Sequence, residues 1–175
     1  MINMKPKYCT IILITLSFAS VYGQGLDENL KLLEPFLNKK WVAKEPRFGE
    51  DAVMEWTFEI IEGGKAIRRS DTLKVVNATS VYFYYWDFEK QEIGVFGIHN
   101  NGNYANGHVK KEDGKILVHG YATFPDNKLE FRNTFEFAED GIFYDKYYRS
   151  EDDTWQAGHS RVFYEIKEKT AAGNK

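Results

Sequence analysis

The sequence MEWTFEII, residues 54–61, alternates large apolar side chains with polar ones and is followed by the pair Gly63-Gly64. Successive side chains of a β-strand point to opposite faces, so this alternation predicts a strand that buries one face. The glycine pair predicts a tight turn, because glycine readily adopts the positive φ angles of two-residue hairpin loops. The stretch therefore indicates a β-hairpin with an apolar inner face.

The register of this hairpin places two charged residues on the apolar face. A two-residue turn at Gly63-Gly64 sets Trp56 opposite Asp71 and Phe58 opposite Arg69. A buried arginine needs a partner, and Asp71 lies two residues further along the same face, which predicts an internal ion pair. In the alternative interpretation Arg69 binds a ligand carboxylate or sulfate, with Trp56 and Phe58 as apolar walls. These four residues form the candidate ligand-binding site.

The rest of the chain repeats the pattern of strand and turn. Turn-forming pairs follow strand-like runs at Asn101-Gly102, Asp113-Gly114, Asp126-Asn127 and Asp140-Gly141. The expected strands span residues 40–47, 52–61, 65–76, 80–87, 92–99, 103–111, 115–123, 129–138, 142–150 and 155–166. Short loops pair neighbouring strands, and a long meander protects its edges by closing. We predict an all-β fold, an up-and-down antiparallel β-barrel of about ten strands.

One helix is expected before the strands, over residues 26–37. Leu30, Leu33 and Leu37 recur at spacings of three and four, and Asp27 is placed to cap the first turn. This pattern indicates a short amphipathic helix that serves as a lid or plug for the barrel.

The first 23 residues have the pattern of a cleavable signal peptide. Lys5 and Lys7 precede the apolar run from Ile11 to Ala19, and a cut is expected between Gly23 and Gln24. The run is shorter than the ~18 to 20 residues of a membrane span, which makes a retained anchor the weaker alternative. We therefore expect a secreted or periplasmic protein with one domain over residues 24–170 and a disordered tail over residues 171–175.

Composition excludes several classes of function. Of the 175 residues 43% are hydrophobic and 16% aromatic, which is too apolar for a disordered chain. The net charge is −3 and becomes more negative when Lys5 and Lys7 are removed, which argues against a nucleic-acid partner. Cys9, the single cysteine, lies in the signal peptide. The mature chain is then expected to lack disulfides, zinc–thiolate sites and cysteine nucleophiles.

The segment Leu37-Asn38-Lys39-Lys40-Trp41, together with Trp86-Asp87 and the final strand carrying Arg161, resembles a calycin-type barrel. The chain is similar to a family of uncharacterised secreted bacterial proteins with lipocalin-like folds. In that family and in lipocalins a Gly-x-Trp motif opens the first strand. Trp41 matches the motif, whereas Lys39 stands in place of the glycine. The resemblance implies a barrel in which Arg161 packs over Trp41 as a cation over an aromatic ring.

A second hairpin brings two histidines together. A turn at Asp113-Gly114 places His108 opposite His119, with Tyr121 on the same face. Imidazoles beside a phenol can bind a metal ion or abstract a proton, so these three residues are catalytic candidates. The opposite face carries valines and isoleucine and is expected to be the core. The histidines are therefore expected to point to water.

Other patterns give no firm cofactor or metal. His159 occupies a late position that could carry a haem iron, and residues 151–153 are a run of acids at a turn, but neither belongs to a motif. Phosphate-binding loops and zinc-protease motifs are absent from the sequence. No cofactor and no metal ion are expected.

Three functions remain open. The first is a binding module that holds a small apolar or amphipathic ligand in the barrel, which requires a partly unfilled interior. The second is an interaction protein that uses the outer aromatics of the run from Tyr82 to Trp86, with a filled barrel. The third is a small lyase, isomerase or cyclase in which His108, His119 and Tyr121 converge in a cleft. The binding module is favoured over both the interaction protein and the enzyme.

Overall fold

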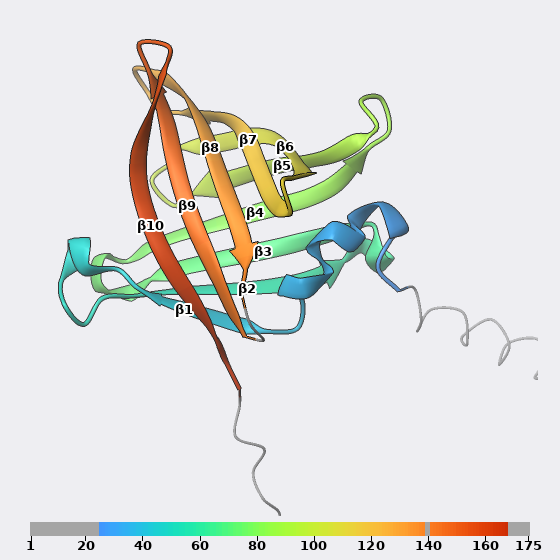
Figure 1. The fold of residues 1–175 in the computed structure, drawn as a ribbon, viewed down its shortest axis with the longest axis horizontal. Coiled ribbons are helices and arrows are strands. Elements are labelled where there is room, and N and C mark those ends of the chain that lie inside the picture. Colours follow the sequence, from blue (N-terminus) through green and yellow to red (C-terminus); the bar gives the residue numbers. More distant parts are fainter. Residues whose placement is uncertain (1–24, 139–140, 168–175) are drawn as a thin grey trace, which may run out of the picture.

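The computed structural model describes residues 25–138 and 141–167. Its strands form one closed antiparallel barrel in which each strand pairs with its neighbours in sequence and the last strand closes onto the first (Figure 1). The strands are β1 (Lys40–Lys44), β2 (Val53–Ile61), β3 (Ala66–Leu73), β4 (Ala78–Asp87), β5 (Glu92–His99), β6 (Tyr104–Glu112), β7 (Lys115–Thr123), β8 (Lys128–Phe137), β9 (Ile142–Glu151) and β10 (Thr154–Ile166). The predicted all-β, up-and-down barrel is confirmed. The expected signal peptide and C-terminal tail lie outside the described residues.

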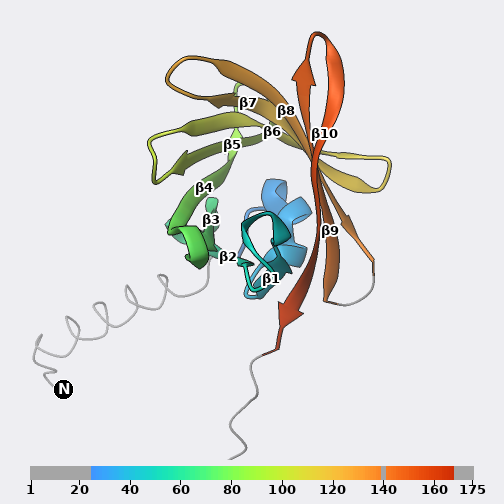
Figure 2. The same cartoon turned by 90° about the vertical axis from the view of Figure 1, so that its left-hand side faces the viewer.

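The predicted N-terminal helix is the 3-10 helix η1 (Glu28–Phe36). Asp27 caps it by accepting a hydrogen bond from the backbone N–H of Asn29 (3.0 Å), and Pro35 lies inside its last turn. Figure 2 shows η1 within the outline of the barrel. Its apolar side chains Leu30, Leu33 and Phe36 are at most 1% exposed, so η1 is a plug rather than a detached lid. Among the described residues no helix is long and apolar enough to cross a bilayer.

The turns at the ends of the strands hold the predicted registers. Gly63 and Gly64 have φ angles of 62° and 93° in the short helix η3 (Glu62–Gly64), which an L side chain adopts only with strain. The β2–β3 register then sets Trp56 opposite Asp71 and Phe58 opposite Arg69, as predicted. Other connections include η2 (Pro46–Phe48), η4 (Lys74–Val76) and the Asp113-Gly114 turn.

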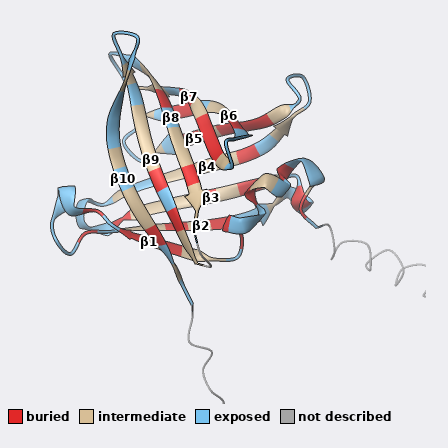
Figure 3. Ribbon diagram, in the orientation of Figure 1, coloured by how far each residue is buried: buried red, intermediate tan, exposed pale blue. Residues whose placement is uncertain are grey.

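The half of the barrel nearest η1 is filled with aromatic rings. Phe36 stacks on Phe58 at 4.8 Å between ring centroids, and Phe143 stacks on Phe163 at the same distance. Trp41 packs edge-on against Phe143 and donates its Nε1 hydrogen to the Phe36 carbonyl (3.1 Å). Figure 3 shows buried residues gathered on the strands and on η1. This packing closes one end of the barrel and leaves the other end to form a site.

The expectation that Arg161 packs over Trp41 is wrong. The β1–β10 register places Glu165, four residues beyond Arg161, opposite Trp41. The cation near the Trp41 ring is Lys39, whose Nζ lies 5.3 Å from the ring centroid. Lys39 replaces the motif glycine, so the cation near the ring comes from the residue before the first strand rather than from the last strand. Arg161 instead points into the barrel interior, at the end opposite η1.

Candidate functional site

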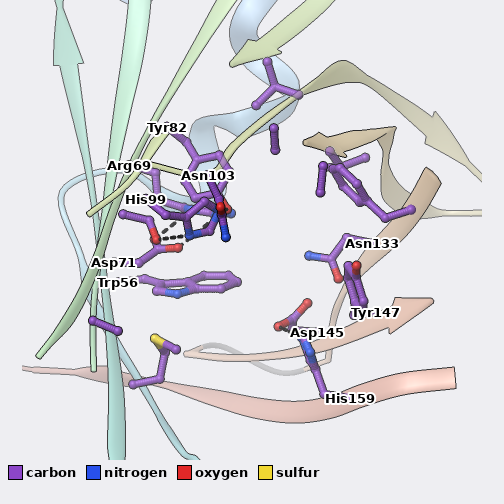
Figure 4. Close-up of a pocket in the computed structure, with 18 of the residues that line it drawn as sticks. Trp56, Arg69, Asp71, Tyr82, His99, Asn103, Asn133, Asp145, Tyr147 and His159 are labelled. Atoms are coloured by element: carbon purple, nitrogen blue, oxygen red, sulfur yellow. Dashed lines mark hydrogen bonds and ion pairs between the residues drawn. The ribbon is translucent and has the colours of Figure 1, made fainter. Parts of the chain in front are cut away.

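A cavity of about 420 Å³ occupies the half of the barrel away from η1 (Figure 4). It reaches solvent between the loops that follow β1, β5 and β7, which contribute Phe48, Asn103 and Phe124 to its lining. Trp56 and Phe131 line its interior. The barrel is therefore filled at one end and hollow at the other.

Three of the four predicted ligand-binding residues line this cavity, namely Trp56, Arg69 and Asp71. Phe58 lies beneath it, buried against Phe36 in the aromatic half. Trp56 forms the boundary between the two halves, since one of its contacts is a stack on Phe163 at 4.1 Å. The alternation of apolar and polar residues along β2 correctly predicted which side chains point into the barrel. It did not predict which of them pack in the core and which line the cavity.

Arg69 is fixed by contacts on its edge and on both faces. Its guanidinium donates to Asp71 Oδ2 and to the Tyr84 hydroxyl, each at 3.0 Å, which confirms the predicted internal ion pair. The same group lies 4.3 Å from the Trp56 ring centroid and 3.9 Å from that of Tyr82, so it is placed for cation–π contact with both rings. Because Asp71 balances its charge and the rings of Trp56 and Tyr82 pack against it, Arg69 is a structural part of the cavity wall.

Burial shifts the titration of this wall. It raises the pKa of Asp71 to about 6, and the charge of Arg69 opposes that shift. It raises the pKa of Tyr84 to about 12. Burial, and to a lesser degree the charge of Arg69, lowers the pKa of His99. His99 contacts Ser80 Oγ through Nδ1 (2.7 Å) and the Tyr82 hydroxyl through Nε2 (3.1 Å). Neutral His99 therefore completes a polar chain along the cavity wall at pH 7.

A second buried charge cluster lies on the other side of the cavity and was not predicted. Arg161 donates from Nε to Glu45 Oε2 (2.5 Å) and from Nη1 to Asp145 Oδ2 (3.3 Å). Arg47 binds both Glu45 oxygens at 2.7 and 2.9 Å. The Arg47 hydrogen bonds hold the pKa of Glu45 at about 2, with Arg161 acting in the same direction and burial opposing both. Glu45 is thus an ionised carboxylate inside the barrel.

His159 joins this cluster next to Tyr147. Its Nε2 lies 2.7 Å from Arg161 Nη1 and 3.1 Å from Asp145 Oδ2. Arg161 has only donors and the Asp145 carboxylate accepts, so the role of Nε2 depends on the tautomer of the ring. The ring stacks on Tyr147 at 5.0 Å, and Gly158, at the β10 bulge, makes room because a Cβ there would lie 2.4 Å from Tyr147 Cδ1. His159 is thus part of the cavity wall, held by Arg161, Asp145 and Tyr147.

Several buried polar atoms of the cavity lining lack a hydrogen-bond partner among the described residues. Trp56 Nε1 is an unpaired donor, and Asn133 Oδ1 and Asp145 Oδ1 are unpaired acceptors. Figure 4 shows Asn133, Asp145 and Tyr147 on the side opposite Trp56 and Asp71. A buried polar group without a partner costs about 1 to 3 kcal/mol. These atoms are therefore positions where a bound molecule gains hydrogen bonds.

Aromatic rings also surround the cavity mouth. Phe48 is 45% exposed, Tyr104 40% and Phe124 36%, and all three line the opening. Asp145, deep in the cavity, is 0% exposed. Aromatic rings thus lie at the rim, and both polar and apolar side chains line the interior.

The catalytic candidates lie on the outer surface of the barrel. His108 and His119 are opposite one another as predicted, with ring centroids 5.3 Å apart. His119 Nε2 lies 2.7 Å from Glu130 Oε1, and Tyr121 is 41% exposed with Lys128 Nζ 4.2 Å above its ring. None of the three lines the cavity. They share a surface strip rather than a cleft.

The chain matches no protein-family model and no curated protein. The chemistry of the cavity is therefore the basis for assigning a function. Within residues 25–138 and 141–167 no three His, Cys, Asp or Glu side chains form a group able to hold a metal ion. Glu151, in the acidic run, pairs with Arg149 at 2.6 Å.

The run from Tyr82 to Trp86 has aromatic rings on both faces of β4. Tyr82 and Tyr84 line the cavity, and Trp86 packs against the core. Tyr85, on the outer face, is 41% exposed. The interaction hypothesis also required a filled barrel, and the cavity does not agree with that requirement.

Proposed function

We propose that the protein is a secreted, lipocalin-like binding protein that holds a small amphipathic molecule in the open half of its barrel. The observation that carries this proposal is a cavity of about 420 Å³ into which buried, unpaired polar atoms of Trp56, Asn133 and Asp145 face. Small-molecule sites have volumes of about 300 to 1,000 Å³ and combine apolar walls with a few placed polar groups. The cavity agrees with both properties.

The apolar share of the lining supports an amphipathic rather than a purely polar ligand. Val95, Val118, Phe131 and Phe135 face the cavity from three strands, β5, β7 and β8. A ligand that covers these side chains gains roughly 25 cal/mol for each Å² of apolar surface removed from water. Hydrogen bonds to the unpaired atoms then fix its orientation.

The fluorescent probe N-phenyl-1-naphthylamine tests the proposal, because it is small, apolar and brightens when it leaves water. The wild-type full chain, expressed in a bacterial host and purified without refolding, is expected to bind the probe at one site. Ala122→Trp places a large side chain in the cavity lining and is expected to abolish binding. The matched control Tyr121→Trp introduces the same residue on the outer face and is expected to bind normally.

Native mass spectrometry of the same preparations gives an independent readout. A co-purified small molecule is expected in wild type and in Tyr121→Trp and not in Ala122→Trp. If Ala122→Trp binds probe as tightly as wild type, or if wild type binds none, the cavity is not a ligand site and the proposal is rejected.

A further inference from the structure

The cavity combines unpaired buried acceptor atoms of Asn133 and Asp145 with aromatic rings at its mouth. We propose that the ligand is a primary amine with an apolar tail, bound with its ammonium group at Asn133 and Asp145 and its tail toward the rim rings of Phe48, Tyr104 and Phe124. This inference rests on the proposed function and names the ligand class of the same site.

Buried charge is the first argument. Asp71 and Asp145 line the cavity, and a third buried acid, Glu45, lies against it. They face two buried arginines, Arg69 and Arg161, whose side chains are 7% and 9% exposed. The third arginine, Arg47, binds both oxygens of Glu45 and balances its charge. Asp145, at 0% exposure, shares Arg161 with Glu45 and is bound only through Oδ2, so its Oδ1 is placed to pair with a ligand cation.

Hydrogen-bonding capacity is the second argument. Asp145 Oδ1 and Asn133 Oδ1 have no partner among the described residues, and both are acceptors. The β8–β9 register pairs Asn133 with Tyr147 and Phe135 with Asp145, which makes Asn133 and Asp145 diagonal neighbours on one face. Diagonal neighbours lie about 7 to 8 Å apart, close enough for one small group to contact both side chains. An ammonium group offers three donors and no acceptor.

The same geometry disfavours an anionic head group. Carboxylates and sulfates only accept hydrogen bonds, and the strongest donor in the cavity, Arg69, is engaged by Asp71 and Tyr84. An anion placed beside Asp145 would add like charge in a buried site. Fatty acids are therefore expected to bind worse than amines of equal length.

The head-group preference is tested at pH 7 by displacing N-phenyl-1-naphthylamine from the full chain. The competing ligands have the same ten-carbon tail and differ only in their head group. Decylamine is expected to displace the probe at a concentration at least about tenfold lower than decanoate, decanol or decyltrimethylammonium, since hydrogen bonds to charged groups are worth a factor of about ten or more. Decanol keeps a donor without the charge, and decyltrimethylammonium keeps the charge without an N–H.

A variant pair locates the preference in the cavity. Asn133→Leu removes one acceptor and is expected to lose about tenfold in decylamine affinity while keeping its affinity for the neutral probe. Thr134→Leu, its neighbour on β8, which alternation turns to the outer face, is expected to behave as wild type. Because Asn133→Leu adds no charge and little volume, probe binding also reports whether the variant has folded.

The outcomes separate this inference from the proposed function. If the probe does not bind wild type, both are rejected. If the probe binds and decanoate, decanol or decyltrimethylammonium competes as well as decylamine, the ammonium assignment is rejected and the binding function stands. Equal decylamine affinity in Asn133→Leu and Thr134→Leu also rejects it.

Discussion

Glu45 makes the stability of the fold depend on pH. Its pKa lies at about 2 against an ordinary value of 4.5, because Arg47 and Arg161 stabilise the ionised form. A carboxyl whose pKa is lower in the folded state stabilises the fold above about pH 4.5 and loses that contribution as pH falls toward 2. After allowance for the exposed Arg47, the loss is expected to be about 2 kcal/mol.

Urea unfolding at pH 7 and at pH 3 measures this loss. Glu45→Gln has no charge to titrate, so its free energy of unfolding is expected to fall less between the two pH values. Glu50→Gln, on the same β1–β2 connection and exposed, is expected to keep the wild-type pH dependence. An unchanged pH dependence in Glu45→Gln would place the acid sensitivity elsewhere.

Arg69 and Asp71 stabilise the fold as a pair rather than individually. Arg69→Met leaves Asp71 buried without its cation, which is expected to cost about 3 to 5 kcal/mol. The double variant Arg69→Met/Asp71→Leu removes both charges and is expected to recover most of that loss. Arg68→Met, which breaks the exposed pair with Glu59, is expected to cost about 1 kcal/mol or less. Urea unfolding distinguishes these cases, and a double variant as unstable as Arg69→Met would disprove the pairing argument.

At the scale of elements, η1 belongs to the core. Phe36 is 0% exposed and contacts rings from β2, β8 and β9, so Phe36→Ala is expected to cost about 3 to 5 kcal/mol. Lys31→Ala, on the exposed face of η1, is expected to change stability by about 0.5 kcal/mol or less. Calorimetry of both variants measures the difference. Equal melting temperatures would show that η1 is not packed into the barrel in solution.

The elements were predictable where local chemistry fixes them. The turn residues Gly63-Gly64 and Asp113-Gly114 set the registers of two hairpins. Counting residues outward from each turn predicts the cross-strand pairs Phe58–Arg69 and His108–His119. The position of Arg161 relative to Trp41 was not predictable in this way. It depends on the β1–β10 register, which no turn connects, and the family motif gave the wrong partner.

At the scale of the whole molecule, some residues of the site are brought together by a local turn and others only by closure of the barrel. Arg69 and Asp71 came from one hairpin, whereas Glu45 and Arg161 are 116 residues apart and meet only when the barrel closes. Alternation within β9 carries a signal for Asp145, since it lies between the inward residues Phe143 and Tyr147. Alternation alone, however, does not tell which inward positions face packed rings and which face a cavity.

The division of the barrel into a filled and a hollow half predicts uneven stability. Aromatic rings hold strand ends near η1, whereas strands around the cavity have fewer buried contacts, and exchange of backbone amides with solvent reports such differences. Amides near the cavity, in residues 96–106 and 120–130, are therefore expected to exchange faster than those of β9 around Phe143. Hydrogen exchange followed by mass spectrometry measures both groups in one sample.

A cavity ligand should slow exchange only in the hollow half. At a free concentration of N-phenyl-1-naphthylamine about 100 times its Kd, openings that destroy the site become about 100-fold rarer. Residues 96–106 and 120–130 are then expected to gain protection, while the β6–β7 hairpin around Asp113-Gly114, at the filled end, keeps its rates. Equal slowing across the molecule would mean that the barrel opens as one cooperative unit, and the two halves would then differ in packing without differing in stability.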